Sequence, residues 1–476
     1  MDTKTQNLHI NNLYDDIILL IFANFDLRTR RCAGETCRRW AGLARRSWRS
    51  LQCISLYTLF ESPKLPKGKH LNKALHWVLK RCGKNLKVLN LADPEPEFRF
   101  VKANERTFHI IGRYCHNLEE IDFTCMLLLN DLLHEWTTLI NCSKLKRINL
   151  NLSFNHFCPV HSGLSALYKA CPKVEFLNIS NSLNARVQDC EELWPEALKE
   201  VYINHAWALT SYSLWSLVKC CPSLRLFSMC GNQCGMDGGL KFVLARLTDL
   251  QILRLEEYPG DSDLGIQIGQ LYNLRELYLS GSTMVTDQVI EAVARGCKKL
   301  EVLDLSVPNG HPESSRHGLL TDEGLLALAH HLPGLKHLNV ERRSYISDEG
   351  ISSIVSNGRI QTLSMAGSDF ITDLTLHALC TYCSDKLSEL RLTQLCNVNS
   401  MAILNLCRKW FVQCTSESGY NLQLHLDEMD FDISDFVQEF EPMTENSVHE
   451  FMMPADGDRP RRTIQVYCDL LVTLYY

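Results

Sequence analysis

This chain of 476 residues lacks the features that mark secreted, membrane-spanning and nucleic-acid-binding proteins. Its first dozen residues are polar, and the apolar run at 17–23 has seven residues, whereas a membrane-spanning helix needs about 20. With 49 Lys and Arg against 55 Asp and Glu, the net charge is −6. That charge gives no electrostatic reason to expect nucleic acid or an anionic membrane as the partner. We therefore expect a protein of the cytoplasm or the nucleus that binds neither nucleic acid nor membrane.

Sequence motifs for catalysis and cofactor binding are also missing. There is no phosphate-binding loop, dinucleotide glycine fingerprint, nucleophile elbow or zinc-protease motif. Cys380 and Cys383 form a C-x-x-C pair without a second pair at a zinc-ribbon spacing. The sequence thus predicts a protein that is not an enzyme and holds no metal or cofactor.

The 21 cysteines follow a pattern that argues against disulfides. Five of them stand three residues before an apolar residue that opens the same motif each time: Cys115, Cys142, Cys171, Cys221 and Cys297. A cysteine that recurs at one structural position behaves as a small buried hydrophobic residue. We predict that these thiols pack in the interior.

The strongest signal is an internal repeat of the form L-x-x-L-x-L. Twelve copies run from Leu86-Leu89-Leu91 to Leu387-Leu390-Leu392, with starts 24 to 35 residues apart. The last two apolar residues of each copy are two apart, so on a strand they face the same side. No copy can bury its apolar face alone, and stability therefore comes from stacking neighbours.

Four copies also show the helix that returns the chain, at 285–297, 320–332, 346–358 and 371–383. Each helix is expected to begin at a capping hydroxyl residue followed by an aspartate, which favours the positive end of the helix. The predicted caps are Thr286, Thr321, Ser347 and Thr372. The pattern resembles the cysteine-containing subtype of leucine-rich repeats over residues 80–395. We predict an α/β solenoid of about 12–13 repeats over residues 51–426, with a curved parallel sheet inside and helices outside.

Strand residues that alternate with the core positions are expected on the concave side. Both charge signs and some aromatic side chains occur there, which suits a protein ligand better than a phosphate backbone. The alternative is that most of these positions are solvated and have no partner. The candidate substrate-binding residues are Arg147, Tyr202, Arg254, Glu256, Tyr278, Asp304, His337, Glu341 and Arg391.

Residues 8–50 do not fit the repeat. Asn11 or Asn12 is expected to cap a helix whose residues 17–22 are all apolar. A helix that is apolar around most of its circumference needs neighbours on more than one side, and a segment of about 40 residues rarely supplies them. One face is left for another subunit, or the helix is simply the terminal cap that a solenoid needs.

The segment LYDDIILLIFANFDLRTRRCAGETCRRWAGLA resembles an F-box, with Tyr14 in place of the usual proline. An F-box before leucine-rich repeats resembles the substrate receptors of SCF-type cullin-RING ubiquitin ligases. The resemblance implies that the helices bind a Skp-type adaptor, and through it a cullin, while the repeats bind a protein substrate. The implied adaptor-binding residues are Leu13, Tyr14, Asp16, Ile17, Ile18, Ile21, Phe22, Leu27, Cys37 and Trp40. The rival interpretation is a leucine-rich-repeat scaffold with no ligase role.

The remaining segments have simpler interpretations. Residues 1–7 form a short N-terminal arm, and eight arginines between 28 and 49 are interpreted as a solvated face. Residues 427–476 begin with an acidic stretch that has no Lys or Arg up to 458, and 464–472 alternates like a strand. We expect this acidic tail to cap the last repeat or fold back over the concave side.

Overall fold

The structure of the chain is a computed structural model that divides into two compact units, Met1–Leu224 and Arg225–Tyr476. It describes residues 10–55, 69–92, 102–128, 138–152, 169–181, 194–206, 210–231, 237–308, 319–368, 370–383, 386–393, 395–399, 401–403, 405–406, 409, 421–427, 463–467 and 471–475. Most of the predicted acidic tail and the arm at 1–7 lie outside the described residues.

The first unit begins with three packed helices. They follow a 3₁₀ turn at Ile10–Asn12 and are α1 (Asp15–Ala23), α2 (Leu27–Thr36) and α3 (Arg38–Arg49). Asp26 caps α2 by accepting the Thr29 amide at 2.5 Å. Tyr14 occupies the cap position of α1 in an extended conformation without a side-chain bond, so the prediction that Asn11 or Asn12 caps this helix is wrong.

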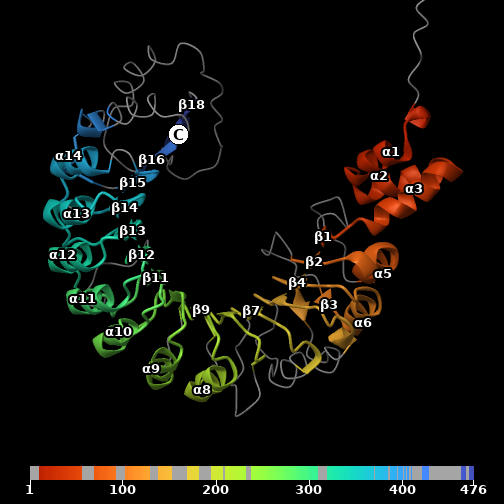
Figure 1. Cartoon of the computed structure of the whole chain (residues 1–476), viewed down its shortest axis with the longest axis horizontal. Helices are drawn as coiled ribbons and strands as arrows, with labels where there is room; N and C mark the ends of the chain where they lie inside the picture. Colours follow the sequence, from red (N-terminus) through yellow and green to blue (C-terminus); the bar gives the residue numbers. More distant parts are fainter. Residues whose placement is uncertain are drawn as a thin grey trace, which may run out of the picture. The chain divides into compact units, whose positions relative to one another are not determined.

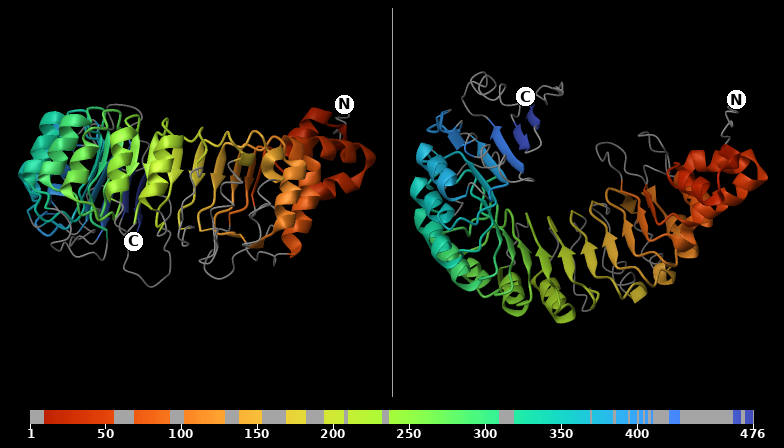
Figure 2. Two further views of the ribbon diagram at one scale, coloured as in Figure 1. Left: turned by 90° about the horizontal axis from the view of Figure 1, so that it is seen from below. Right: turned by 45° about the horizontal axis from the view of Figure 1, so that its top comes forward.

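Parallel strands and covering helices make up the rest of the first unit (Figure 2). The strands pair in the order β1 (Cys53–Ser55), β2 (Val88–Asn90), β4 (Glu120–Asp122), β6 (Arg147–Asn149), β7 (Phe176–Asn178) and β8 (Glu200–Tyr202). The helical elements are α5 (Lys69–Cys82), η2 (Gly83–Asn85), α6 (Glu105–Tyr114) and α8 (Ser211–Cys220), and β3 (Lys102–Ala103) pairs with β5 (Leu127–Leu128). β1 precedes the twelve predicted copies. The sequence prediction omitted it, although Leu51, Ile54 and Leu56 have the same spacing as the twelve copies, and Ile54 is buried.

The second unit repeats this arrangement, with its helices on the outer side of a curved stack of strands (Figure 1). The helices are α9 (Asp237–Arg246), α10 (Ser262–Ile268), α11 (Asp287–Gly296), α12 (Asp322–His331), α13 (Asp348–Val355) and α14 (Asp373–Tyr382). The parallel strands are β9 (Leu226–Ser228), β10 (Ile252–Arg254), β11 (Glu276–Tyr278), β12 (Val302–Asp304), β13 (His337–Asn339), β14 (Thr362–Ala366), β15 (Glu389–Thr393) and β16 (Asn421–Asp427). Two antiparallel strands, β17 (Thr463–Tyr467) and β18 (Leu471–Tyr475), complete the sheet beyond β16.

The strand register follows the leucine pattern. Leu253 aligns with Leu277 and Leu277 with Leu303, and all three side chains are buried. All twelve predicted copies coincide with strands of the two units. The prediction of an α/β leucine-rich-repeat solenoid is confirmed, because each buried leucine fills the space between a strand and its returning helix.

The aspartate after each helix cap lies in the first turn as predicted, and it also has a second role. Thr286, Thr321, Ser347 and Thr372 do cap their helices. The following aspartate, however, reaches the start of the next helix: Asp322 accepts the Ser347 amide at 2.9 Å and the Ser347 hydroxyl at 2.5 Å. Each helix start is therefore tied to the next by a carboxylate, in an arrangement that we call the aspartate ladder.

The recurrent cysteines lie in the interior as predicted, and none is joined in a disulfide among the described residues. Three of these thiols, those of Cys171, Cys221 and Cys297, point to the preceding repeat. Cys221 donates to the Pro195 carbonyl at 3.3 Å and Cys297 to the Ile268 carbonyl at 3.4 Å. Burial raises the pKa of Cys297 to about 12, so this thiol stays protonated at neutral pH.

Candidate functional site

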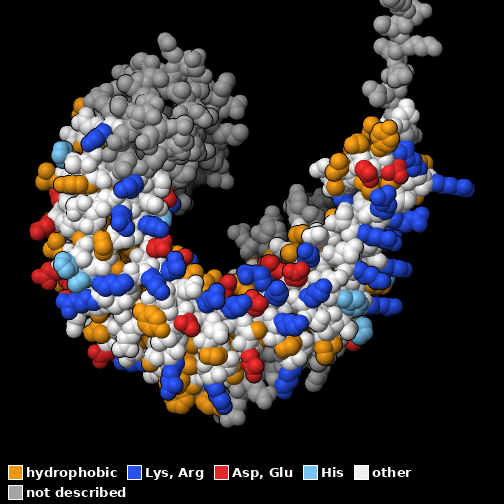
Figure 3. All heavy atoms as spheres, in the orientation of Figure 1, with side chains coloured by type: hydrophobic (Ala, Val, Ile, Leu, Met, Phe, Trp, Pro, Cys, Tyr) orange, Lys and Arg blue, Asp and Glu red, His pale blue; other side chains and the backbone are white. Residues whose placement is uncertain are grey.

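Helix α1 buries one side in the first unit and leaves another side exposed. Ile18 and Phe22 are fully buried against α2 and α3. Tyr14 is 84% exposed, Ile17 44% and Leu20 64%, and they recur at the three-residue spacing of one helix face. With Ile10 they form what we call the α1 face, where Figure 3 shows hydrophobic side chains gathered over α1.

Three of the residues assigned to the adaptor by resemblance belong to the interior instead. Ile18, Phe22 and Leu27 are buried in the chain's own core, so in this conformation they support the α1 face and are not part of it. Sequence alone did not separate them, because every residue from 17 to 22 is apolar. Only the packing of α2 and α3 against α1 shows which side of this helix is covered.

The other residues implied by resemblance lie at or near the surface. Leu13, Ile21 and Trp40 are half-buried against the core. The Trp40 ring stands edge-on to Phe22 at 5.2 Å between centroids. Exposed Cys37 accepts the Trp40 amide at 3.4 Å and caps α3. The carboxylate of Asp16 is exposed beside this face. Adaptor binding by these residues stays a prediction.

Ion pairs hold α1 against α3. Arg39 donates to the carboxylate of Asp15 from Nε at 2.9 Å and from Nη2 at 2.7 Å. Its Nη2 also donates to the Leu13 carbonyl at 2.6 Å. Both donors meet one carboxylate oxygen, Oδ1 of Asp15, and the additional bond to the Leu13 carbonyl fixes the guanidinium against the start of α1. The exposed side of α1 is therefore presented on a fixed frame.

On the strand face of the first unit, Arg147 is the centre of a cluster. Its guanidinium lies 3.9 Å over the Phe176 ring, and Glu120 and Glu200 flank it at 3.7 and 3.8 Å. Phe176 in turn lies beside Tyr202, with ring centroids 5.5 Å apart and ring planes tilted by 49°. The sequence prediction omitted Phe176, although it precedes Leu177 as Arg147 precedes Ile148 and the register pairs the two.

The second unit carries a similar cluster around Tyr278. The Arg254 guanidinium lies 3.8 Å over the Tyr278 ring, and the phenol donates to Glu276 at 2.9 Å. Arg254 also pairs with Glu256 at 3.4 Å. Burial raises the pKa of Tyr278 to about 12 and also raises the pKa of Glu256. These desolvated, stacked groups form a semi-rigid polar surface of the kind that protein interfaces use.

The remaining predicted substrate residues lie along the same row of strands. Asp304 aligns with Tyr278 in the register. His337 contacts Thr362 at 2.9 Å, and burial lowers the pKa of this imidazole. Arg391 donates to Glu389 at 2.7 Å. Glu341 is half-buried just after β13. The structure places all nine candidates on exposed or half-exposed strand-face positions, and their binding role stays a prediction.

Across the residue ranges that the structure describes, no three His, Cys, Asp or Glu side chains come together in a way that would hold a metal ion. Within the same ranges, no helix combines the length and the apolar character needed to cross a membrane. Stacked rings, fixed guanidinium groups and an exposed apolar helix side are features of protein docking surfaces.

Comparison with known sequences gives distant relatives, and no family model matches the chain. It is 20% identical over 377 residues to the Caenorhabditis elegans protein EEED8.10, whose name provisionally marks it as RNA-binding, covering 77% of this chain and 48% of that protein. It is 29% identical over 130 residues to antagonist of mitotic exit network protein 1 of Candida glabrata, covering 27% and 23%. The chain thus spans about half of the first relative and about a quarter of the second.

Solved structures with similar folds are equally distant in sequence. An internalin from Listeria monocytogenes has 16% identity and a TM-score of 0.46, covering 80% of this chain and 97% of that one. A chain of the yeast complex of Rad7 and Elc1 has 16% identity and a TM-score of 0.48, covering 75% and 89%.

Proposed function

We propose that this protein is the substrate-recognition subunit of an SCF-type ubiquitin ligase. The α1 face would bind the Skp-type adaptor, and the strand faces would bind a protein substrate. The observation that carries the proposal is the exposure of Tyr14, Ile17 and Leu20 on a helix whose opposite side is already buried. The F-box resemblance of residues 13–44 supplies the identity of the partner.

The physical reason is the cost of leaving these side chains in water. Burying an Ile or Leu side chain fully is worth about 1.5–3 kcal/mol. The chain's own helices already cover the other side of α1, with Ile18 and Phe22 at its centre. Ile17 and Leu20 remain exposed in the folded chain. A partner that covers them would therefore bind with the free energy gained by burying these two side chains.

In this role the protein contributes proximity. The adaptor and its cullin would hold the N-terminal helices, and a strand-face cluster, that of Arg147 or that of Tyr278, would hold the substrate. Holding two reactants together raises their effective concentration without any reacting group from the receptor. The proposal includes an intracellular location, in the cytoplasm or the nucleus, where the ligase operates.

A binding measurement with purified components tests the adaptor contact. The full chain is immobilised and titrated with a Skp-type adaptor, and Ile17→Glu/Leu20→Glu is compared with wild type. We expect the double variant to lose at least about tenfold in affinity, since two buried charges cost more than the 1.4 kcal/mol that tenfold represents. The matched control is Leu374→Glu, at an α14 position that is 68% exposed, which should bind as wild type does.

The same experiment separates the proposal from the scaffold alternative. If wild type binds no adaptor, the ligase role is wrong and a scaffold remains. If the double variant binds as wild type while its circular dichroism is unchanged, the α1 face is not the contact. The substitutions avoid Ile18 and Phe22, whose loss would unfold the helices and give a false positive.

A further inference from the structure

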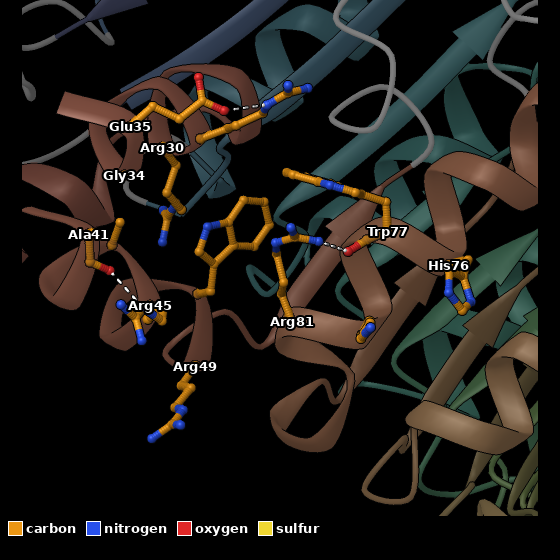
Figure 4. A pocket seen from close by; sticks show the side chains of 13 residues that line it. Arg30, Gly34, Glu35, Ala41, Arg45, Arg49, His76, Trp77 and Arg81 are labelled. Atoms are coloured by element: carbon orange, nitrogen blue, oxygen red, sulfur yellow. Dashed lines mark hydrogen bonds and ion pairs between the residues drawn. The ribbon is translucent and has the colours of Figure 1, made fainter. Parts of the chain in front are cut away.

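A groove of about 960 Å³ lies between α2, α3 and α5 in the first unit (Figure 4). Its lining includes one carboxylate, Glu35, which pairs with Arg31 at 3.1 Å. Its cations are Arg30, Arg31, Arg45, Arg49, Lys80 and Arg81. We call this the basic groove. It is separate from the α1 face and from the strand faces, and the function proposed above does not use it.

Folding sorts the arginine run of residues 28–49 into different roles. Arg39 and Arg46 turn toward Asp15 and Asp16 of α1. Arg45 and Arg49 instead line the groove, where α5 adds Lys80 and Arg81 from the opposite side. The charge of the groove is therefore a product of tertiary structure, and the sequence run contributes only part of it.

Buried Arg30 belongs to the wall of the groove. It is 1% exposed and donates to three carbonyls: Ser47 at 2.6 Å, Ala23 at 3.0 Å and Phe25 at 3.1 Å. These carbonyl oxygens accept from its two terminal nitrogens, its buried Nε has no hydrogen-bond partner among the described residues, and a neutral carbonyl does not cancel the charge. The positive potential of this guanidinium therefore adds to that of the exposed cations around it.

Trp77, packed against Trp48, contacts two of the six cations. Trp48 of α3 meets Trp77 of α5 edge-on at 5.4 Å between centroids. The Arg81 guanidinium lies 3.8 Å over the Trp77 ring, and Arg31 lies 5.6 Å from its centroid. Asn85 ties the end of α3 to the first repeat by donating to the Arg49 carbonyl at 2.6 Å. Part of the groove is thus ordered before any ligand binds, so binding costs less side-chain entropy than it would with freely rotating side chains.

The cations also repel one another in the free protein. Burial lowers the pKa of Arg81, and the nearby charge of Arg31 lowers it further. Six cations against one carboxylate leave the groove strongly positive in a chain whose net charge is −6. An anionic ligand would relieve this repulsion and form charge-assisted hydrogen bonds with the guanidinium groups.

We propose that the basic groove binds an acidic segment of a partner protein. Clustered arginines recognise phosphorylated or acidic motifs through bidentate bonds. Single-stranded RNA would be expected to stack its bases on exposed aromatic rings, but Arg81 already covers a face of Trp77 and Trp48 is buried. The geometry therefore favours carboxylate or phosphate groups on a peptide.

Fluorescence anisotropy with the full chain tests the proposal. The probes are a short labelled peptide rich in Asp and Glu, a serine-phosphorylated version of it, its Asn and Gln analogue, and oligouridine. The test variant is Arg49→Glu/Lys80→Glu. It reverses the charge of two groove residues whose side chains are exposed, so the core is not disturbed. The matched control, Arg106→Glu/Arg113→Glu, makes the same charge change on α6 outside the groove.

We expect the acidic peptide to bind wild type and the control alike, with affinity that falls as salt rises. The groove variant should bind about tenfold more weakly, which corresponds to roughly 1.4 kcal/mol. The acidic and phosphorylated peptides distinguish carboxylate from phosphate as the preferred anion. Absence of peptide binding, equal loss in both charge variants, equal binding of the neutral analogue, or tighter binding of oligouridine would each overturn the proposal. Adaptor binding is measured separately, so its failure does not affect this result.

Discussion

Asp287 of α11 accepts both the backbone amide and the hydroxyl of Thr321, each at 2.8 Å, although 34 residues separate the two. It also accepts the Gly324 amide at 3.0 Å. The first amides of a helix have no partner within the helix. In the aspartate ladder the preceding repeat supplies that partner, so one carboxylate both caps a helix and fixes its distance from its neighbour.

The ladder predicts that Asp348→Ala destabilises the second unit. Asp348 accepts the amide and hydroxyl of Thr372 at 2.8 and 2.6 Å and the amide of Thr375 at 3.2 Å. Leaving such partly buried donors without a partner costs about 1–3 kcal/mol. Urea unfolding of the full chain should show the loss, and the exposed neighbour substitution Glu349→Ala should leave the midpoint near that of wild type. Equal midpoints for both variants would refute a structural role for the ladder.

The close approach at Gly324 predicts a penalty for a single methyl group. A Cβ there would lie 2.7 Å from Oδ1 of Asp287 and 2.6 Å from Cδ1 of Leu320. We expect Gly324→Ala to cost about 1–3 kcal/mol through overpacking. Gly334→Ala is the control, because a Cβ there meets nothing within 4 Å. Thermal melting compares the two, and a melting temperature for Gly324→Ala equal to that of Gly334→Ala would contradict the packing described.

The buried thiols predict lower stability at high pH. Burial raises the pKa of Cys142, Cys171 and Cys297 to about 12 from an ordinary value of 9.0. Below pH 9 these thiols are protonated in both the folded and the unfolded state, so the stability gained by burying them as neutral groups is fully present. As pH rises toward 12 the unfolded chain loses these protons first, and the free energy of unfolding falls.

Urea midpoints across this alkaline range measure the effect. Substitution of one buried thiol, Cys297→Ala, should make the decline with pH shallower, although the variant is less stable at neutral pH because it leaves a cavity. An unchanged slope would show that Cys297 ionises in the folded state as easily as in the unfolded one.

Arg30 predicts a local effect on the N-terminal helices. Its guanidinium joins the end of α1, the α1–α2 turn and α3 through the carbonyls of Ala23, Phe25 and Ser47. Arg30→Ala should destabilise these helices by about 1–3 kcal/mol, since it removes three hydrogen bonds in which a charged group is the donor. Intrinsic tryptophan fluorescence, to which the nearby Trp48 contributes, and far-ultraviolet circular dichroism follow the change. Exposed Arg38→Ala is the comparison, and a matching unfolding curve for both would argue against this role.

The repeat architecture could be predicted from sequence because its cause is local and periodic. Leu253, Leu277 and Leu303 face the core for the same reason, a two-residue alternation on a strand, and the caps at Thr286 and Thr321 act within four residues. The omission of Phe176 is different. Its place opposite Arg147 follows from the strand register. A phenylalanine, however, is as compatible with the core as with the concave surface, so the residue type alone did not identify it as a surface residue.

What the sequence by itself determined is the placement of strands, helices and buried leucines and cysteines, since these depend on short-range spacing and hydrophobicity. Tertiary structure alone decided which side of α1 remains exposed, that Asp287 serves the next helix, and that Arg49 and Arg81 share one groove. The reason is that exposure and electrostatic environment depend on distances between residues far apart in the chain. Those distances exist only once the helices and repeats have packed.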